Sequence, residues 1–181
     1  MAAHAITSEA IVRCVEAGVR TIEHANLIDA PTAELCAEAG VYVVPTMVIY
    51  QRMVEAADEI GLNQMAVEKS AVVLAGAHEA LAHLREAGTK VGFGTDMVFS
   101  PWDDYLFDEI KLRREVFSPL EILQQATSVN AEILGLTGKL GVVAPGAFGD
   151  LLIVDGDPLI DPSLLSEADR LMVIQGGALI R

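Results

Sequence analysis

The stretch from Lys90 to Asp96 reads Lys-Val-Gly-Phe-Gly-Thr-Asp and decides the fold class. Val91 and Phe93 alternate with glycines, which predicts a short strand that is buried on both faces and closely approached by its neighbours. Thr95 and Asp96 then end the strand with two polar side chains. In parallel α/β proteins the residues at the C-terminal ends of strands build the functional site. Asp96 is therefore the first candidate for chemistry, although an aspartate here also suits a simple turn.

The chain on both sides of this stretch alternates predicted strands and helices. Further strands are expected at 1–4 (incomplete), 19–24 and 41–45, and helices at 9–17, 29–40, 46–61, 63–87, 104–116 and 119–134. Four strand–helix units are half the count of a closed (β/α)8 barrel, and they would also form a small open doubly wound sheet. No Gly-x-Gly-x-x-Gly follows the first strand, so a dinucleotide-binding fold has no positive support.

The character of the sequence changes after Gly135. Glycines and prolines punctuate short β-like pieces, of which Leu151 to Val154 and Leu171 to Gln175 are the best strands. Gln175-Gly176-Gly177-Ala178 is typical of a hairpin bend. We therefore predict two domains, an α/β domain over 1–140 and a β-rich domain over 141–181.

Composition excludes several classes of partner. The 181 residues are 52% apolar, and 26 acidic against 12 basic residues give a formal charge of -14. A charge of this sign argues against nucleic acid or an anionic membrane as a partner. No run of about 18 apolar residues occurs, and the first residues lack the features of a signal peptide. Cys14 and Cys36 form no Cys-x-x-Cys motif, so we expect reduced, buried thiols in a cytoplasmic protein.

Three ligand-type residues occupy matching places in successive strand–helix units. His4, His24 and Asp96 each end a predicted strand, so their side chains would meet at one rim of the sheet. Taken singly, each histidine is more typical of a hydrogen-bonded structural residue. Taken together, two imidazoles and a carboxylate favour a divalent metal site, with zinc as the preferred ion. His78 and His83 stand five apart on a predicted helix and diverge by roughly 140°, so they are not expected to share a metal.

Two aromatic residues are candidates for the wall of a substrate pocket at the same rim. Tyr50 follows the third strand and Trp102 follows the fourth. Each also has a simpler interpretation, since Tyr50 suits helix packing and Trp102 suits an apolar anchor for its loop.

Several motifs, in this order, resemble the amidohydrolase superfamily, and most closely its prolidase and imidazolonepropionase-like branch with the Xaa-Pro and Xaa-Arg dipeptidases. They are Ala3-His4-Ala5-Ile6-Thr7, Ile22-Glu23-His24-Ala25-Asn26-Leu27-Ile28-Asp29, Val43-Val44-Pro45-Thr46, Phe93-Gly94-Thr95-Asp96, Ala126-Thr127-Ser128-Val129-Asn130-Ala131-Glu132-Ile133-Leu134-Gly135 and Gly141-Val142-Val143-Ala144-Pro145-Gly146-Ala147-Phe148-Gly149-Asp150-Leu151-Leu152-Ile153-Val154. The resemblance extends over essentially the whole chain.

This resemblance implies a fold and a chemistry. The chain would be the C-terminal half of a (β/α)8 TIM-type barrel, with strands five to eight, followed by part of a small β-sandwich. His4 and His24 would bind the second of two metal ions in the complete enzyme. Asp96 would bind the first ion and shuttle the proton as a metal-activated water hydrolyses the C–N bond of a dipeptide or another small amide.

The sequence also departs from the family. The family's His-x-His pair and its bridging lysine come from strands one and four, and no His-x-His occurs anywhere in this chain. We therefore expect the isolated chain to be inactive, and either to need the missing N-terminal half or to self-associate. The alternative function is that of a non-catalytic barrel fragment, or a subunit, which requires a partner chain to supply the missing ligands.

Overall fold

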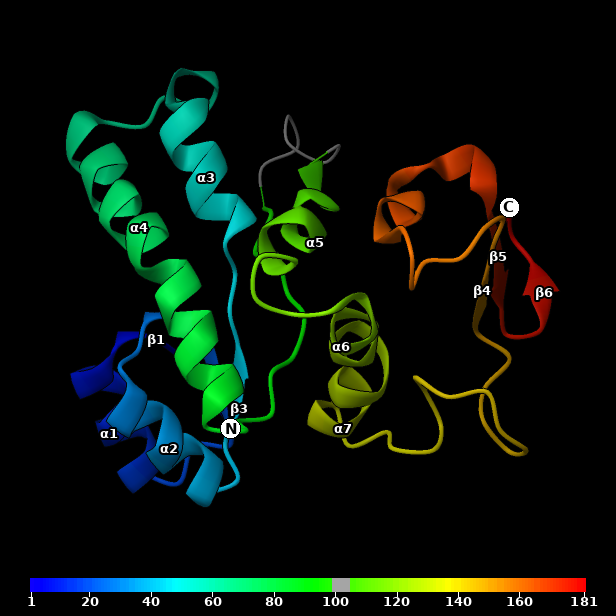
Figure 1. Cartoon of the computed structure of the whole chain (residues 1–181), viewed down its shortest axis with the longest axis horizontal. Helices are drawn as coiled ribbons and strands as arrows, with labels where there is room; N and C mark the ends of the chain where they lie inside the picture. Colours follow the sequence, from blue (N-terminus) through cyan, green and yellow to red (C-terminus); the bar gives the residue numbers. More distant parts are fainter. Residues whose placement is uncertain (99–104) are drawn as a thin grey trace. The chain divides into compact units, whose positions relative to one another are not determined.

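The computed structural model describes residues 1–98 and 105–181. These pack as two compact units, Met1–Val116 and Phe117–Arg181 (Figure 1). The first unit contains a parallel sheet and the helices that cover it, and the second contains a separate antiparallel sheet. The predicted domain boundary near residue 140 separates α/β from β-rich sequence, whereas these units are separated by packing. That boundary stays a prediction.

The parallel sheet of the first unit follows the chain order β1 (Ala2–Thr7), β2 (Thr21–Leu27) and β3 (Tyr42–Val44). The connecting helices are α1 (Ser8–Glu16) and α2 (Ala30–Glu38). The α/β class with a parallel sheet, predicted from the alternation of strands and helices, is confirmed. β3 is buried along its whole length, which explains its continuous apolar sequence.

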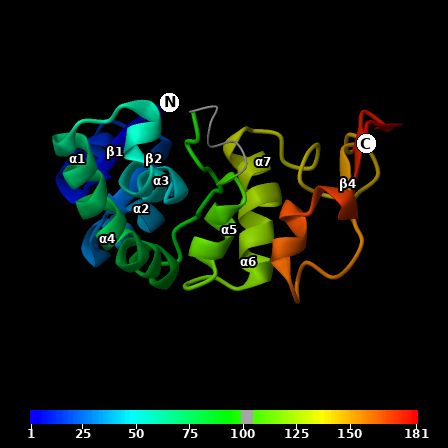
Figure 2. The same cartoon turned by 90° about the horizontal axis from the view of Figure 1, so that it is seen from above.

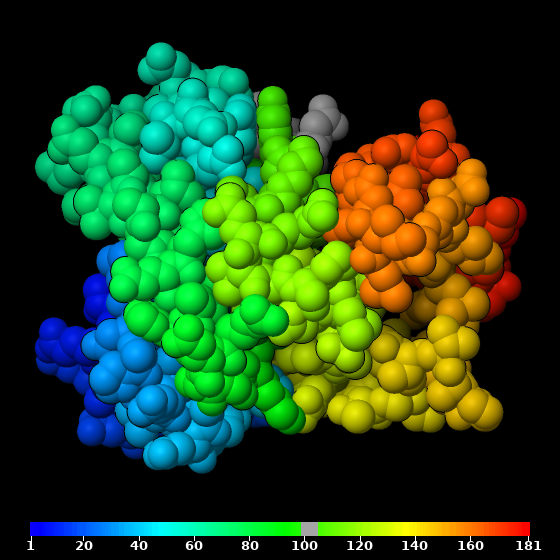
Figure 3. Space-filling model, in the orientation of Figure 1, coloured from blue at the N-terminus to red at the C-terminus, as the bar shows by residue number. Residues whose placement is uncertain are grey.

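The first unit also contains α3 (Val48–Glu55) and the long α4 (Gln64–Glu86). They lie side by side, and α4 also packs on β2 (Figures 1–3). The residues that α4 buries include Val73, Ala77, Leu81 and Leu84, at the spacing of one helix face. In the described part of the chain, no helix is long and apolar enough to cross a membrane.

The predicted strand at Lys90 to Thr95 is much reduced in the structure. Its ladder consists of a single parallel bridge between Val43 and Val91, with Gly92 N–H donating to the Val43 carbonyl at 2.9 Å. The carbonyl of Gly92 accepts instead from the guanidinium of Arg113, at 2.8 Å. The next donor to this carbonyl in the ladder would be the N–H of residue 45, but Pro45 has none, so the buried Arg113 side chain satisfies a group that the strand pairing leaves open.

α5 (Asp108–Arg113) also belongs to the first unit. The second unit begins with α6 (Pro119–Gln124), a π-helical turn (Gln125–Val129) and α7 (Asn130–Ile133). Ser118 followed by Glu121 three residues later predicts a capping box at the start of α6. The structure confirms it, since each of these two side chains accepts a hydrogen bond from the backbone N–H of the other residue.

An antiparallel sheet ends the chain, with β4 (Leu151–Val154), β5 (Leu171–Gln175) and β6 (Ala178–Leu179) in that order. The strands and the hairpin bend at Gly176 and Gly177 match the sequence prediction. Both glycines have positive φ, as the bend requires.

Candidate functional site

Two histidine rings meet across neighbouring parallel strands. His4 lies in β1 and His24 in β2, and the register pairs Ala5 with His24. Nδ1 of His4 lies 2.8 Å from Nε2 of His24, and the ring centroids are 5.0 Å apart. One of these nitrogens carries the proton of this bond, so a metal between them would have to replace that proton. The structure thus brings together the two predicted histidines, while their role as metal ligands stays a prediction.

The sequence predicts that His4 and His24 each end a strand, and the structure shows that neither does. β1 continues to Thr7 and β2 to Leu27. Instead, His24 (φ 81°) and Ala25 (φ 53°) adopt left-handed backbone conformations within β2. Asp96 has φ 53° as well, so both predicted strand-end positions on β2 and on the fourth segment are strained. Strain of this kind costs on the order of 1–3 kcal/mol per residue and clusters at functional sites.

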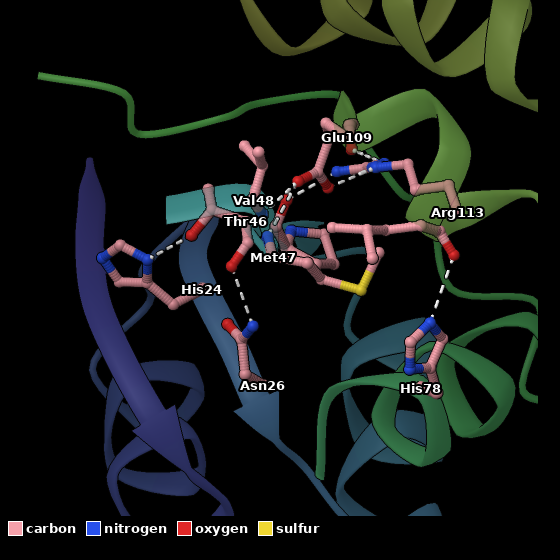
Figure 4. Close-up of polar contacts among 11 residues, drawn as sticks. His24, Asn26, Thr46, Met47, Val48, His78, Glu109 and Arg113 are labelled. Atoms are coloured by element: carbon pink, nitrogen blue, oxygen red, sulfur yellow. Dashed lines mark hydrogen bonds and ion pairs between the residues drawn. The ribbon is translucent and has the colours of Figure 1, made fainter. Parts of the chain in front are cut away.

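The ring of His24 is deeply placed and has partners on two sides. Its side chain is 7% exposed, and its Nδ1 lies 2.9 Å from Oγ1 of Thr46 (Figure 4). The Tyr50 ring meets it edge-on, with centroids 6.2 Å apart. Burial lowers the pKa of His24 below its usual 6.5, and this outweighs the opposing charge of Asp96. His24 is therefore held neutral near pH 7, the form in which imidazole binds metals.

Asp96 is exposed, and its influence on this site is electrostatic. After burial, its charge is a further cause of the raised pKa values of Tyr50 and Glu23, while His4 lowers that of Glu23. Among the residues that the structure describes, no group of three His, Cys, Asp or Glu side chains is arranged to hold a metal ion. His4 and His24 thus form a pair of donors, and the three-ligand site that includes Asp96 stays a prediction.

A buried ion pair holds the chain segment that follows β3. Glu109 and Arg113 of α5 are fully buried, and Nε of Arg113 donates to Oε1 of Glu109 at 2.8 Å. The other carboxylate oxygen of Glu109 accepts from the N–H groups of Met47 and Val48, at 2.8 and 2.9 Å (Figure 4). Since α3 begins at Val48 and has no capping side chain of its own, Glu109 serves as its N-terminal cap from a distance.

Sequence reasoning missed this ion pair because its signal is ambiguous. Glu109 and Arg113 stand four apart, as do many exposed helix pairs. In the same helix Asp108 and Lys111, three apart, also form an acid–base pair, and the Lys111 side chain is 64% exposed. Only tertiary packing distinguishes the buried pair from the exposed one.

The remaining residues considered in the sequence are Tyr50, Trp102, His78 and His83. Tyr50 is half-buried in α3 against His24, whereas Trp102 lies outside the described residues. His78 contacts the Leu112 carbonyl at 3.3 Å and so packs α4 against the end of α5 (Figure 4), and His83 faces Glu79 on its own helix. The structure therefore keeps His78 and His83 out of the histidine pair, in agreement with their predicted divergence.

Comparison with known proteins identifies the family of this chain. The sequence model of the amidohydrolase family matches residues 1–178. The chain belongs to the amidohydrolase family. The relatives put this amidohydrolase in the prolidase-like branch of the superfamily.

Two crystal structures illustrate the similarity. This amidohydrolase is 42% identical to a prolidase complexed with N-methylphosphonate-L-proline, with a TM-score of 0.95 over 99% of this chain and 44% of that one. It is 28% identical to a Xaa-Pro dipeptidase with bound methionine in its active site, with a TM-score of 0.84 over 99% of this chain and 44% of that one.

The similarity to a curated relative covers similar shares of the two chains. An uncharacterized protein of Mycobacterium tuberculosis is 28% identical over 175 residues, which is 96% of this chain and 46% of the relative. This amidohydrolase therefore spans a little under half the length of the proteins that it matches.

Proposed function

We propose that this chain is the C-terminal half of a (β/α)8-barrel amidohydrolase that hydrolyses the C–N bond of a dipeptide with a divalent metal. The supporting observation is the pair of imidazole nitrogens facing each other across β1 and β2. It occurs in a chain that resembles prolidase structures over 99% of its length. In this proposal, residues 141–181 are part of a small β-sandwich, and the protein works in the cytoplasm.

The donor set fits a divalent transition metal, and zinc is our first choice. Nδ1 of His4 and Nε2 of His24 are the two atoms that would hold it, since they already face one another. Bound there, such an ion would polarise an amide carbonyl and acidify a water molecule. Burial keeps His24 neutral and thus ready to donate its lone pair.

We assign the proton transfer to Asp96. Its carboxylate is exposed, so it can accept a proton from a reacting water and deliver it to the leaving nitrogen. In the complete enzyme it would also be a metal ligand. Tyr50, beside His24, and Trp102 would wall the pocket for the substrate side chain.

An alternative function has support of its own. The described residues provide two facing donors rather than three, and the chain corresponds to under half of its relatives. The chain would then be a non-catalytic subunit, or one half of a split enzyme, whose partner supplies the remaining ligands. The partner would be either the missing N-terminal half or a second copy.

Zinc titration of the 181-residue chain tests the metal site. We expect calorimetry to detect zinc binding by the wild type and its loss in His4→Ala and His24→Ala. The matched controls His78→Ala and His83→Ala remove the other two histidines and should leave binding intact. Binding that survives in His24→Ala, or is absent from the wild type, would overturn the metal assignment.

A dipeptide panel then separates the two functions. Xaa-Pro and Xaa-Arg dipeptides are incubated with the zinc-loaded chain, and free amino acids are measured. Turnover that disappears in Asp96→Asn would support a competent enzyme. Zinc binding without turnover would favour the subunit, and adding a polypeptide that carries the family's missing strands should then restore hydrolysis.

Self-association is the simplest form of partnership. β1 pairs only with β2 among the described residues, which leaves its other edge open to another chain. We expect light scattering after size exclusion to give a mass above the 19.3 kDa of one chain. A sharp, cooperative melt at monomer mass would contradict this.

A further inference from the structure

The segment from Pro45 to Val48 is fixed by buried side chains at four successive residues. Arg113 donates to the Pro45 carbonyl at 2.5 Å, and Asn26 donates to the Thr46 carbonyl at 2.9 Å. Glu109 accepts from the next two N–H groups, those of Met47 and Val48. Asn26, Glu109 and Arg113 are each at most 1% exposed, so water does not compete for these bonds. The backbone of Thr46 is therefore held from both sides (Figure 4).

This arrangement fixes the position of the Thr46 hydroxyl. Thr46 is 4% exposed, and its Oγ1 lies 2.9 Å from Nδ1 of His24. Two buried elements thus meet through this contact, namely the strand that carries His24 and the clamped segment that follows β3. A hydroxyl in a fixed position limits the orientation of the ring that it contacts.

The hydrogen bonds of His24 permit two proton arrangements. In the first, Nδ1–H of His24 donates to Thr46 and Nε2 accepts a proton from Nδ1–H of His4. In the second, the Thr46 hydroxyl donates to Nδ1 and Nε2–H donates to His4. Only the first leaves Nε2 as a lone pair facing His4. It also puts any positive charge on His4, which is exposed, rather than on the buried His24.

We infer that Thr46 is a positioning residue that holds His24 in its Nδ1–H tautomer, with the Nε2 lone pair turned toward His4. Thr46 would not touch the metal or the substrate itself. The Asn26, Glu109 and Arg113 contacts keep its hydroxyl in register with the ring. The tautomer follows from these contacts and from the cost of placing a charge on the buried His24, whereas its value for metal binding rests on the proposed function.

The tautomer is measured directly by ¹⁵N NMR of the metal-free chain. At about pH 8, where imidazole is neutral, the two ring nitrogens of His24 give separate signals for the protonated and the unprotonated state. We expect a protonated Nδ1 in the wild type and in Thr46→Ser, which keeps the hydroxyl. Thr46→Val keeps the shape and removes the hydroxyl, so its His24 should shift toward the Nε2–H form. A wild-type His24 protonated at Nε2 would overturn the inference without any mutant.

Zinc affinity provides the second measurement, by competition with a chelator. We expect Thr46→Val to lose about 10- to 100-fold in affinity and Thr46→Ser to stay close to the wild type. The matched control is Thr89→Val, because Thr89 is also buried and its hydroxyl donates to the Ala33 carbonyl at 2.8 Å. This control should weaken stability without changing zinc affinity or the His24 tautomer.

The outcomes separate the inference from the proposed function. If the wild type binds no zinc, the proposed function fails, and the NMR result still decides the role of Thr46. If Thr46→Val and Thr89→Val lose the same stability and Thr46→Val keeps the wild-type tautomer and affinity, Thr46 is structural only and the inference is wrong.

Discussion

Glu109→Ala is expected to destabilise the first unit severely, because it removes the carboxylate that forms an ion pair with the buried guanidinium of Arg113. Removing one member of a buried ion pair typically costs about 3–5 kcal/mol. Glu109 and Arg113 are both 0% exposed, so solvent cannot take over the lost interaction. The variant also leaves the N–H groups of Met47 and Val48 without their acceptor.

The free energy lost in Glu109→Ala can be compared with the total free energy of unfolding of a domain. Each orphaned backbone group costs about 1–3 kcal/mol, and a domain typically has about 5–15 kcal/mol in total. Glu109→Ala should therefore cost at least about 3 kcal/mol. The double variant Glu109→Leu with Arg113→Met removes the unpaired charge, yet it still leaves the Met47, Val48, Pro45 and Gly92 groups unbonded. We expect it to recover only part of the loss.

Urea unfolding at fixed protomer concentration measures these differences, since association would make the midpoint depend on concentration. The matched control is Lys111→Met, which breaks the exposed pair with Asp108 in the same helix. A change within about 0.5 kcal/mol is expected for that control. If Glu109→Ala unfolds within about 1 kcal/mol of Lys111→Met, or if the double variant fully regains wild-type stability, the reasoning from buried charge and backbone bonds fails.

Three further predictions concern separate parts of the chain. Burial lowers the pKa of His24, so the unfolded state binds more protons and stability should fall as the pH drops through 6.5. An equally steep fall in His24→Asn would contradict this. Burial raises the pKa of Cys36 to about 11, so iodoacetamide should label Cys14 in the native chain and Cys36 only after denaturation, as mass spectrometry of the peptides would show. Gly141→Ala should lower the free energy of unfolding by more than about 1 kcal/mol relative to Gly146→Ala. Both glycines have positive φ, but of the two only Gly141 would place its new Cβ against backbone, 2.5 Å from that of Thr127. Equal urea midpoints for the two variants would refute the clash.

Local sequence signals predicted the elements that depend on local physics. The capping box at Ser118, the hairpin at Gly176 and the alternation of strands and helices all have periods or caps within a few residues. The meeting of His4 and His24 was also predictable, because parallel strands bring equivalent positions together.

The supporting residues of the site were not predictable in the same way. In the sequence Thr46 stands out only as part of a motif, and Glu109 resembles an ordinary surface residue of a helix. Their roles depend on contacts between residues about 20 and 60 positions apart, such as His24 with Thr46 and Met47 with Glu109. The fourth strand was overpredicted because its pairing with β3 depends on the register, which places Pro45, a residue without an N–H, opposite the Gly92 carbonyl.

The distant cap on α3 also bears on how this unit folds. A helix with a local cap can nucleate from its own sequence, but the first turn of α3 obtains its acceptor from a residue 61–62 positions later. Closing so long a loop costs entropy before the bond forms. The start of α3 must therefore become ordered late, together with α5, and the loss of either helix should unravel the other. Through this shared step, the geometry around His24 becomes complete only when most of the first unit is already in place.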